Sequence, residues 1–480
     1  MGLISTKGIL IGFILLLLTA SVFAETNSPS FYGKRSVSSG EPQAQKETIT
    51  FQRRAIIIIP EEPVLDSTIV TEPELTNADE VKDTASHPFQ SAIPPIELSR
   101  NDKLLAKKAH HYFDQNWNKT TGFTDSVQGY HHVTMWDVAS DISAQLSLEG
   151  LGLQSEEWTN IKLQKLLTTL KSMPLYKDKL PNREYDTKTG KPSGRYSKAK
   201  TNGNGWSALD IGRLLIWLHI IKQEKNELAP LVDSVINHWS LSSAVHQKTL
   251  FGTKLSKRGE HFRQEGRLGY LQYAAFGFAL FGFDVSDSYL KKDIEQVSID
   301  DVSIYIDTRN MPFSTADPYV LMALELGNYS EWWQQLDVIY KLYQQKEKRT
   351  NRLWVFSEDA MNRSPWFAYN NIFFYGKSWL STSSGGKPIE IFQIFSNKVA
   401  LGLSVIFDDD YAKKLKVQVI ENSINSRVIP TGLYSDGLIN SAYNINTNSM
   451  VLSSLWYKMN NRSPALKRDT MLKGITGNVE

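Results

Sequence analysis

The chain has 480 residues, with 53 Lys or Arg, 51 Asp or Glu and no cysteine. The near-neutral charge, without any basic run, argues against nucleic acid or an anionic membrane surface as a partner. The missing cysteines exclude disulfides, thiolate metal sites and cysteine nucleophiles, so the fold must be stable through its core alone.

The first 24 residues are typical of an export signal. Lys7 precedes an apolar run over residues 9–20, and Val22 to Ala24 forms a small-x-small cleavage site before Glu25. The apolar run is short for a membrane span, although an uncleaved anchor is the alternative. We therefore expect a mature monomer that starts at Glu25, is periplasmic or secreted, and has no stable membrane insertion.

Residues 25–99 change in composition. They are rich in Ser, Thr, Glu and Pro and poor in aromatic residues, which predicts a disordered, low-complexity linker. The segment 51–60, FQRRAIIIIP, is β-branched and ends in a proline. It is predicted either as an edge strand docked on the domain or as an apolar piece of the tail.

From Arg100 onward, apolar helical segments recur at separations of about 50 to 80 residues. The six segments cover residues 134–149, 206–221, 264–282, 316–327, 397–407 and 447–459. A more amphipathic segment precedes each one, at residues 102–114, 156–171, 227–239, 287–292, 330–345 and 409–421. Six such pairs predict an all-α domain over residues 100–463, an (α/α)6 toroid of twelve helices, with a tail at 464–480.

Two connections inside these pairs are long and rich in Gly, Tyr and Trp. They cover residues 180–205 and 355–379. Loops of this length in a compact domain are usually functional or disordered, and their aromatic content argues against disorder. We expect them to gather above the N-termini of the inner helices, at the end of the ring where a pocket is predicted.

Several of these segments also resemble a known family. The motifs are DSVQGYHHVTMWDVAS, LPNREYDTKTG, ALDIGRLL, QEGRLGYLQYAAFGFALFG, PYVLMALELG, SEDAMN, YNNIFFYGKSW and GLYSDG. In this order they resemble the bacterial domain of unknown function 3131 family, which is related to glucoamylase-like glycoside hydrolases. The resemblance implies an (α/α)6 fold and a carbohydrate substrate, without an established reaction. Ala360 stands where the family pattern often has a histidine after SED.

The chemistry that these residues support is glycoside hydrolysis. That reaction needs one carboxyl group to protonate the leaving oxygen, a second to attack or to activate water, and aromatic faces for the sugars. The chain has no GxSxG, HExxH, Walker or GxGxxG motif. The histidine pairs 110–111 and 131–132 are adjacent and would diverge on a helix, so neither a metal nor another cofactor is predicted.

Three aspartates lie where helices begin, so each has a capping interpretation. Asp137 and Asp210 have the Ser/Thr-x-x-acid spacing of a capping box, and Asp317 before a proline is typical of an N-cap. For Asp210 and Asp317 the structural role is favoured. Asp137 is also a catalytic candidate, because Trp136 and a Tyr-His-His loop stand beside it.

Two glutamates are the stronger catalytic candidates. Glu265 is predicted to open an inner helix between Arg263 and Arg267, which would keep it ionised as a base or nucleophile. An ion pair with one of these arginines is the structural alternative. Glu358 lies in an aromatic loop, where burial would keep it protonated as a general acid; a solvated loop carboxylate is its alternative. Asp137 is the reserve for the role of Glu265.

The remaining candidates are predicted to contact substrate. They are Tyr130, His132, Trp136, Arg183, Asp186, Asp210, Arg267, Asp317, Asp359, Trp366, Tyr369, Asn370 and Trp379. Asp186 and Arg183 could instead pin their own loop.

Together these observations predict a carbohydrate-active protein, a glycoside hydrolase that acts on a bacterial glucan or exopolysaccharide. Two alternatives belong to other classes. One is a polysaccharide-binding protein of an export or assembly system that does not turn over its ligand. The other is a toroidal polysaccharide lyase, with Tyr130, His131 or His132 as the base. Binding without new reducing ends favours the first, and unsaturated products that absorb in the ultraviolet favour the second.

The linker prediction can be checked by limited proteolysis of the exported protein. We expect removal of about the first 95 residues and one resistant core, because low-complexity segments cannot bury enough surface to resist cleavage. N-terminal sequencing of the periplasmic fraction should show Glu25. Two resistant fragments of similar size, or an intact chain in the inner membrane, would contradict this organisation.

Overall fold

The computed structural model describes residues 96–309, 313–327 and 331–467. The predicted export signal, most of the predicted linker with its segment 51–60, and residues 468–480 of the tail lie outside the described residues. None of the helices in the described part is both long and apolar enough to span a bilayer.

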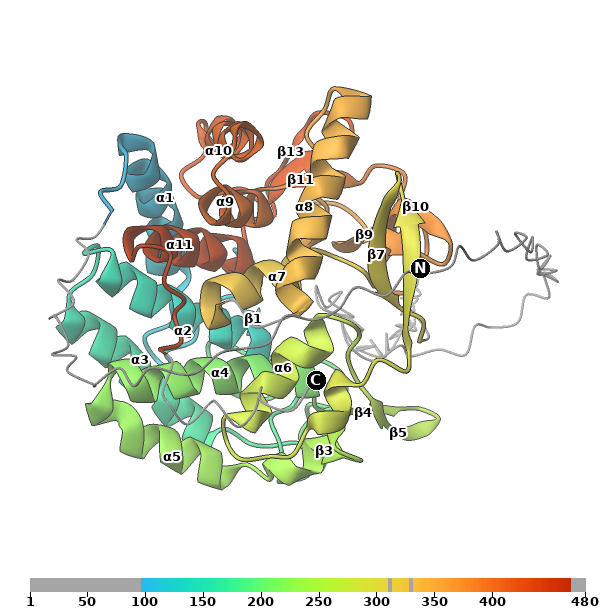
Figure 1. Ribbon diagram of the computed structural model, residues 1–480. Helices are drawn as coiled ribbons and strands as arrows, with labels where there is room; N and C mark the ends of the chain where they lie inside the picture. The colour runs from blue at the N-terminus through green and yellow to red at the C-terminus, as the bar shows by residue number, and fades with distance from the viewer. Residues whose placement is uncertain (1–95, 310–312, 328–330, 468–480) are drawn as a thin grey trace, which may run out of the picture.

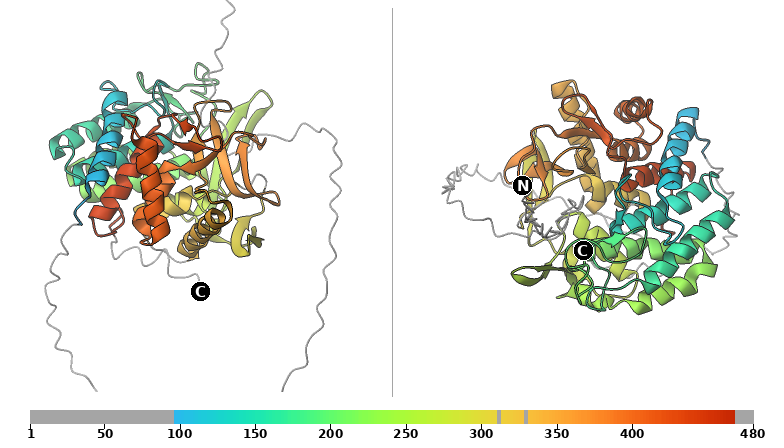
Figure 2. Two further views of the ribbon diagram at one scale, coloured as in Figure 1. Left: turned by 90° about the horizontal axis from the view of Figure 1, so that it is seen from above. Right: turned by 180° about the vertical axis from the view of Figure 1, so that it is seen from behind.

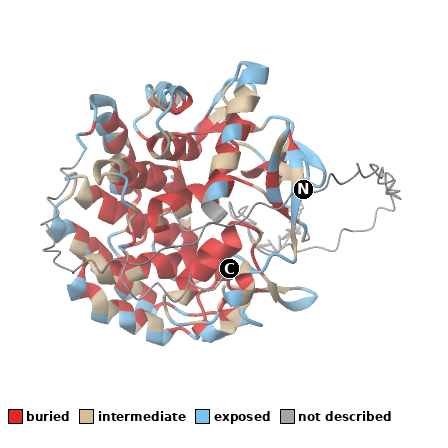
Figure 3. Cartoon of the chain, viewed as in Figure 1, coloured by how far each residue is buried: buried red, intermediate tan, exposed pale blue. Residues whose placement is uncertain are grey.

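Six helical segments form an inner ring, which confirms the predicted helical toroid (Figure 1). They are α2 (Met135–Gly150), α4 (Ala208–Glu224), α6 (Tyr270–Ala279), α7 (Asp317–Leu321), which continues into the π-turn η4 (Met322–Leu326), α9 (Asn397–Ile406) and α11 (Ile445–Met459). They are apolar around most of their circumference and buried on nearly every face (Figure 3). α2 packs against α4 and α11, α4 against α6, and α9 against α11 and α7.

Small residues let two neighbouring inner helices approach closely. A side-chain carbon on Gly277 of α6 would lie 1.9 Å from the carbonyl oxygen of Gly212 on α4. A side-chain carbon on Gly269, which precedes α6, would lie 2.8 Å from Pro318 on α7, and Gly269 also has a φ of +90°. Both positions therefore require glycine, for the α4–α6 contact and for the α6–α7 contact respectively.

Five amphipathic helices form the outer layer. They are α1 (Arg100–Asn116), α3 (Glu156–Ser172), α5 (Ala229–His238), α8 (Glu331–Thr350) and α10 (Asp410–Ser423). The twelve-helix prediction is wrong at the fourth outer position. The 3₁₀ turn η3 (Ser286–Tyr289) and the hairpin β6 (Ile294–Ile299) with β7 (Val302–Asp307) stand there. Asp300 and Asp301 at its tip have positive φ, as a tight hairpin turn requires.

Five small antiparallel sheets lie in the connections, so the all-α prediction is not confirmed. Besides β6 with β7, they comprise β1 (His132–Val133) with β2 (Tyr185–Asp186), β3 (Val245–His246) to β4 (Thr249–Ser256) to β5 (Gly259–Gln264), β8 (Glu358–Ala360) to β9 (Phe367–Phe374) to β10 (Lys377–Ser383), and β11 (Gln393–Ser396) to β12 (Gly432–Tyr434) to β13 (Ile439–Asn440). Two short 3₁₀ turns, η1 (Asn226–Leu228) and η2 (Leu241–Ala244), flank α5. A strand precedes every inner helix in the chain, so the sheets accompany the N-terminal end of the ring (Figure 2).

The first and last helices of the ring are joined by one buried carboxylate. Asp102 of α1 closes a capping box with Ser99 and forms ion pairs with Lys416 of α10 (2.6 Å) and Lys458 of α11 (2.9 Å). Burial alone would raise the pKa of Asp102, but hydrogen bonds from the two lysines lower it to about 2. Nearby, the Ile96 amide donates to the Met459 carbonyl at 3.0 Å, so the start of the described chain lies against the end of α11.

Asp102→Asn should lower the free energy of unfolding at pH 7 by about 1 to 2 kcal/mol, once solvent screening is allowed for. Because the folded pKa is about 2 and the usual value is 3.8, the contribution is complete above about pH 4 and is lost as the pH falls towards 2. Urea unfolding of both proteins between pH 2 and 7 measures this. A difference that does not shrink at low pH would contradict the ion-pair role.

Candidate functional site

Side-chain and backbone amides tie together the N-terminal ends of α2, α11 and α9. Asn446 in the first turn of α11 donates to Asp137 in the first turn of α2 at 2.9 Å. Asn444, the N-cap of α11, donates to Thr431 Oγ1 at 2.9 Å, and the Thr431 carbonyl accepts the Asn397 amide at the start of α9 at 3.0 Å. These N-termini therefore meet at one end of the ring, where aligned helix dipoles favour negative charge.

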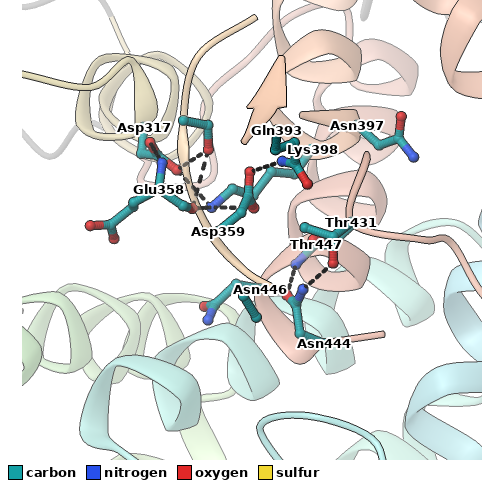
Figure 4. A network of polar contacts seen from close by, with 12 residues as sticks. Asp317, Glu358, Asp359, Gln393, Asn397, Lys398, Thr431, Asn444, Asn446 and Thr447 are labelled. Carbon is teal, nitrogen blue, oxygen red and sulfur yellow. Dashed lines mark hydrogen bonds and ion pairs between the residues drawn. The ribbon is translucent and has the colours of Figure 1, made fainter. Parts of the chain in front are cut away.

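A buried lysine continues this chain of contacts from α9 to α7. The Lys398 ammonium lies 2.7 Å from Asp317 and 3.3 Å from Asp359, and it donates to the Glu358 carbonyl at 2.6 Å (Figure 4). Burial lowers the pKa of Lys398, but the two carboxylates hold it above its ordinary value. The pKa of Asp359 is raised to about 7 by burial and by Asp317, against the effect of Lys398. Asp359 also accepts a hydrogen bond from Gln393.

The backbone amide and carbonyl groups of Glu358 are both held by this cluster. The Glu358 amide donates to Asp317 at 3.0 Å, and the Ser357 hydroxyl donates to the same carboxylate at 2.8 Å. The predicted N-cap role of Asp317 is therefore wrong. Ala316 is the N-cap of α7, no side chain caps it, and the Asp317 carboxylate bonds Lys398 and residues 357–358 instead. In Figure 4 the Glu358 carboxyl group points away from Lys398.

Glu265 does not open an inner helix, because α6 begins five residues later at Tyr270. It is fully buried. One carboxylate oxygen accepts from Arg183 at 3.0 Å, and the other accepts from the amide of Ala208, the first residue of α4. Glu265 therefore forms an ion pair with Arg183, a residue of the 180–205 loop. The Arg183 guanidinium also donates to the Thr253 carbonyl, so this contact fastens the 180–205 loop to α4 and β4.

Asp137 and Asp210 lie in the first turns of α2 and α4, and a capping box is formed by Asp137. Asp137 is buried and closes a capping box with Thr134, while its second oxygen accepts from Asn446. Asp210 is buried, and its amide donates to the Ser207 hydroxyl, which caps α4. Trp136 is also buried, with its ring centroid 4.6 Å from the Arg213 guanidinium. The side chains of Asp137 and Trp136 therefore pack inside the ring.

A buried ion pair that the sequence analysis missed crosses the ring. Arg213 of α4 donates to Glu325 of η4 at 3.3 Å and to Ser140 of α2 at 2.8 Å. The pKa of Glu325 is raised above its ordinary value because the effect of burial exceeds the opposing effects of Arg213 and the Tyr273 hydroxyl. The signal was available, because an arginine inside the apolar run ALDIGRLLIW has to find a buried partner.

A second carboxyl group that the sequence analysis missed is that of Glu184, which lies between the candidates Arg183 and Asp186 in the chain. It is half-buried and accepts from the Tyr130 hydroxyl at 2.6 Å. The Tyr130 ring lies 4.5 Å from the His132 ring, and His132 Nδ1 lies 2.9 Å from Ser193 Oγ. Burial raises the pKa of Glu184, and Tyr130 and His132 oppose the shift. A raised pKa in a partly accessible carboxyl group is what a general acid needs.

An aromatic cluster connects Glu184 with Glu358. Tyr130, which holds Glu184, packs in the same small apolar cluster as Tyr369, the cross-strand partner of Glu358. Phe313 stacks on Tyr369 with centroids 3.8 Å apart. Thus Glu184 contacts this cluster through Tyr130, and Glu358 pairs across the strands with another member, Tyr369.

Three other residues that were predicted to contact substrate form hydrogen bonds within the protein. Asp186 accepts from the amides of residues 188 and 189 and so pins its own turn. The Asn370 amide group donates to the Ser357 carbonyl at 2.7 Å, which supports β8. Burial lowers the pKa of Arg267 to about 10, and its guanidinium donates to Gln264.

Two predicted tryptophans have different surroundings. The Trp379 indole donates to Asp300 on the β6–β7 hairpin at 3.2 Å and packs against Phe356, with ring centroids 5.5 Å apart. Trp366 is 38% exposed at the turn before β9. No group of three or more His, Asp or Glu that could hold a metal occurs in the described ranges.

Solved structures of similar fold include an endo-β-1,2-glucanase and a candidate glucoamylase. An endo-β-1,2-glucanase from Chitinophaga pinensis, in complex with sophorotriose and glucose, has a TM-score of 0.56 and 12% identity over 77% of this chain and 96% of its own. A candidate glucoamylase from Bacteroides caccae has a TM-score of 0.57 and 10% identity over 75% of this chain and 92% of its own. At these identities the likeness shows the shared (α/α)6 fold.

A family model described as a protein of unknown function, DUF3131, matches residues 104–461. No curated protein matches the chain.

The buried Glu265 contact yields a stability prediction. Glu265→Gln should lower the free energy of unfolding by about 3 kcal/mol, because it leaves the Arg183 charge without its partner. Denaturant unfolding measures this. Glu97→Gln is the matched control, since its pair with Lys103 is exposed and should be worth about 0.5 kcal/mol. Equal losses in the two variants would show that Glu265 is no structural anchor.

Proposed function

The chain belongs to the DUF3131 family, and from its glucanase-like fold we propose that it is a glycoside hydrolase acting on a bacterial glucan or exopolysaccharide. The observation that carries the proposal is the placement of two carboxyl groups, Glu184 and Glu358, around one aromatic cluster at the N-terminal end of the ring. The predicted export signal supports action in the periplasm or outside the cell.

The two carboxyl groups take different roles in this proposal. Glu184 carries the raised pKa and partial exposure that suit the general acid, so it would protonate the leaving glycosidic oxygen. Glu358, beside the helix N-termini, would act as the carboxylate that attacks the sugar or activates water. The predicted pair was Glu358 as acid and Glu265 as base. Glu265 is replaced because both of its carboxylate oxygens bond other parts of the protein. Glu184, whose pKa is raised, takes the acid role, which leaves the second role to Glu358.

The surroundings supply sugar recognition and charge. Tyr130 is only partly buried and can offer a sugar its aromatic face, whereas Tyr369 is buried and stacked on Phe313. The oxocarbenium-like transition state is positive, so the carboxylate of Glu358 would stabilise it. The proteins of similar fold include glucanases solved with sophorose or sophorotriose, which makes β-1,2-glucans the first substrates to try.

The proposal is tested on a panel of β-1,2-, β-1,3- and β-1,4-glucans and bacterial exopolysaccharides, with assays for new reducing ends. On a substrate that is cleaved, Glu184→Gln should lower kcat about 10²- to 10⁴-fold while binding remains, because it removes the proton donor. The activity of the unmodified protein should fall as the pH rises through the raised pKa of Glu184, since the donor is then lost.

Glu157→Gln, on the exposed face of α3, is the control and should leave kcat unchanged. Normal turnover by Glu184→Gln would remove Glu184 from the reaction. Binding of a glycan without new reducing ends would favour the non-catalytic alternative, and ultraviolet-absorbing products would favour the lyase.

A further inference from the structure

We infer that Lys398 and Asp317 are positioning residues that fix the direction of the Glu358 carboxyl group. The inference rests on the proposed function. Two inner helices bond the backbone of the same residue, because Asp317 from α7 accepts the Glu358 amide at 3.0 Å and Lys398 from α9 donates to the Glu358 carbonyl at 2.6 Å. Figure 4 shows both contacts on the side opposite the carboxyl group.

β8 is an edge strand whose free edge is bonded by side chains. It pairs with β9 alone in its sheet. At the end of the strand, the Asn440 amide donates to the Ala360 carbonyl at 2.8 Å. Asn440 also donates to Gln393, and Gln393 donates to Asp359. The strand that carries Glu358 is therefore held along its length by buried polar groups, although it is only three residues long.

Because side chains alternate along a strand, these backbone contacts also determine the direction of the Glu358 side chain. Successive residues of a strand point to opposite faces. Asp359 faces Lys398 at 3.3 Å, so Glu358 has to face the other way. The ion pairs thus anchor the back of the strand, and the carboxyl group of Glu358 is presented on its front.

Buried ion pairs are a poor way to gain stability, because desolvation offsets much of their attraction. The protein nevertheless buries one ammonium and two carboxylates behind Glu358. Lys225 provides the comparison at the other end of the ring. It is also buried, with ion pairs to Glu149 and Glu156, but it lies at the C-terminal end of α4. Of these two lysines, Lys398 bonds the backbone of a proposed catalytic residue and Lys225 does not.

The test compares Lys398→Met with Lys225→Met, since each removes a buried, doubly paired ammonium. On a cleaved glucan, Lys398→Met should lower kcat about 10- to 100-fold with KM within about twofold, because a misdirected carboxyl group impairs the chemical step more than binding. Lys225→Met should keep kcat. If Lys398→Met does not fold, the double variant D317N/K398M, which removes one charge of each sign, replaces it.

Hydrogen exchange of the peptide that carries Glu358 gives a readout independent of activity. We expect the Glu358 amide to exchange at least about tenfold faster in Lys398→Met than in Lys225→Met, because the strand loses its anchor. A kcat within about twofold of the control would overturn the inference. If the unmodified protein cleaves no glycan, the proposed function fails by itself, and unchanged exchange at Glu358 would then overturn the positioning role.

Discussion

The parallel direction of the inner helices governs the structure. Six helices that run the same way leave their unbonded amides and positive dipole ends at one end of the ring. Carboxylates and amide side chains have to gather there, and the described residues show how. Glu265 bonds the first amide of α4, Asp137 caps α2, and Asn444 caps α11. The polar site at this end therefore follows from the arrangement of the helices, before any question of substrate.

The contacts at this end join neighbouring helices, and they also give the free amides of the first turns their hydrogen-bond partners. Asp137 links α2 to α11, and Lys398 links α9 to α7. Deeper in the ring, Arg213 reaches from α4 to both α2 and η4. Each contact is directional, whereas apolar packing between the same helices is not. Their combined effect is to fix the rotation of each inner helix about its own axis, so that side chains in the first turns have a defined direction.

The sequence was sufficient to predict the ring of inner helices, but it was not sufficient to predict the contacts of the candidate site. Apolar periodicity located the inner helices because burial on all faces leaves a strong local pattern. The β6–β7 hairpin was missed although the start of β7 alternates between partly buried or buried and exposed residues, because the count of pairs suggested a helix there. Asp317 was read as a cap because its true partner, Lys398, lies 81 residues further along the chain. Glu265 and Glu184 likewise take their roles from partners distant in sequence, Arg183 and Tyr130, which no local pattern encodes.

The junction at Asp102 has a topological consequence. There α1 meets α10 and α11, and the Ile96 amide meets the Met459 carbonyl, so the last helix pair contacts the first as any pair contacts the next. The order of the pairs is thus a closed cycle, and the place where the polypeptide begins is arbitrary with respect to packing. A circularly permuted chain, with its ends joined here and opened in an exposed connection between two other pairs, would make the same core contacts. What distinguishes the pairs from one another is the connections they carry, and those connections hold Glu184 and Glu358.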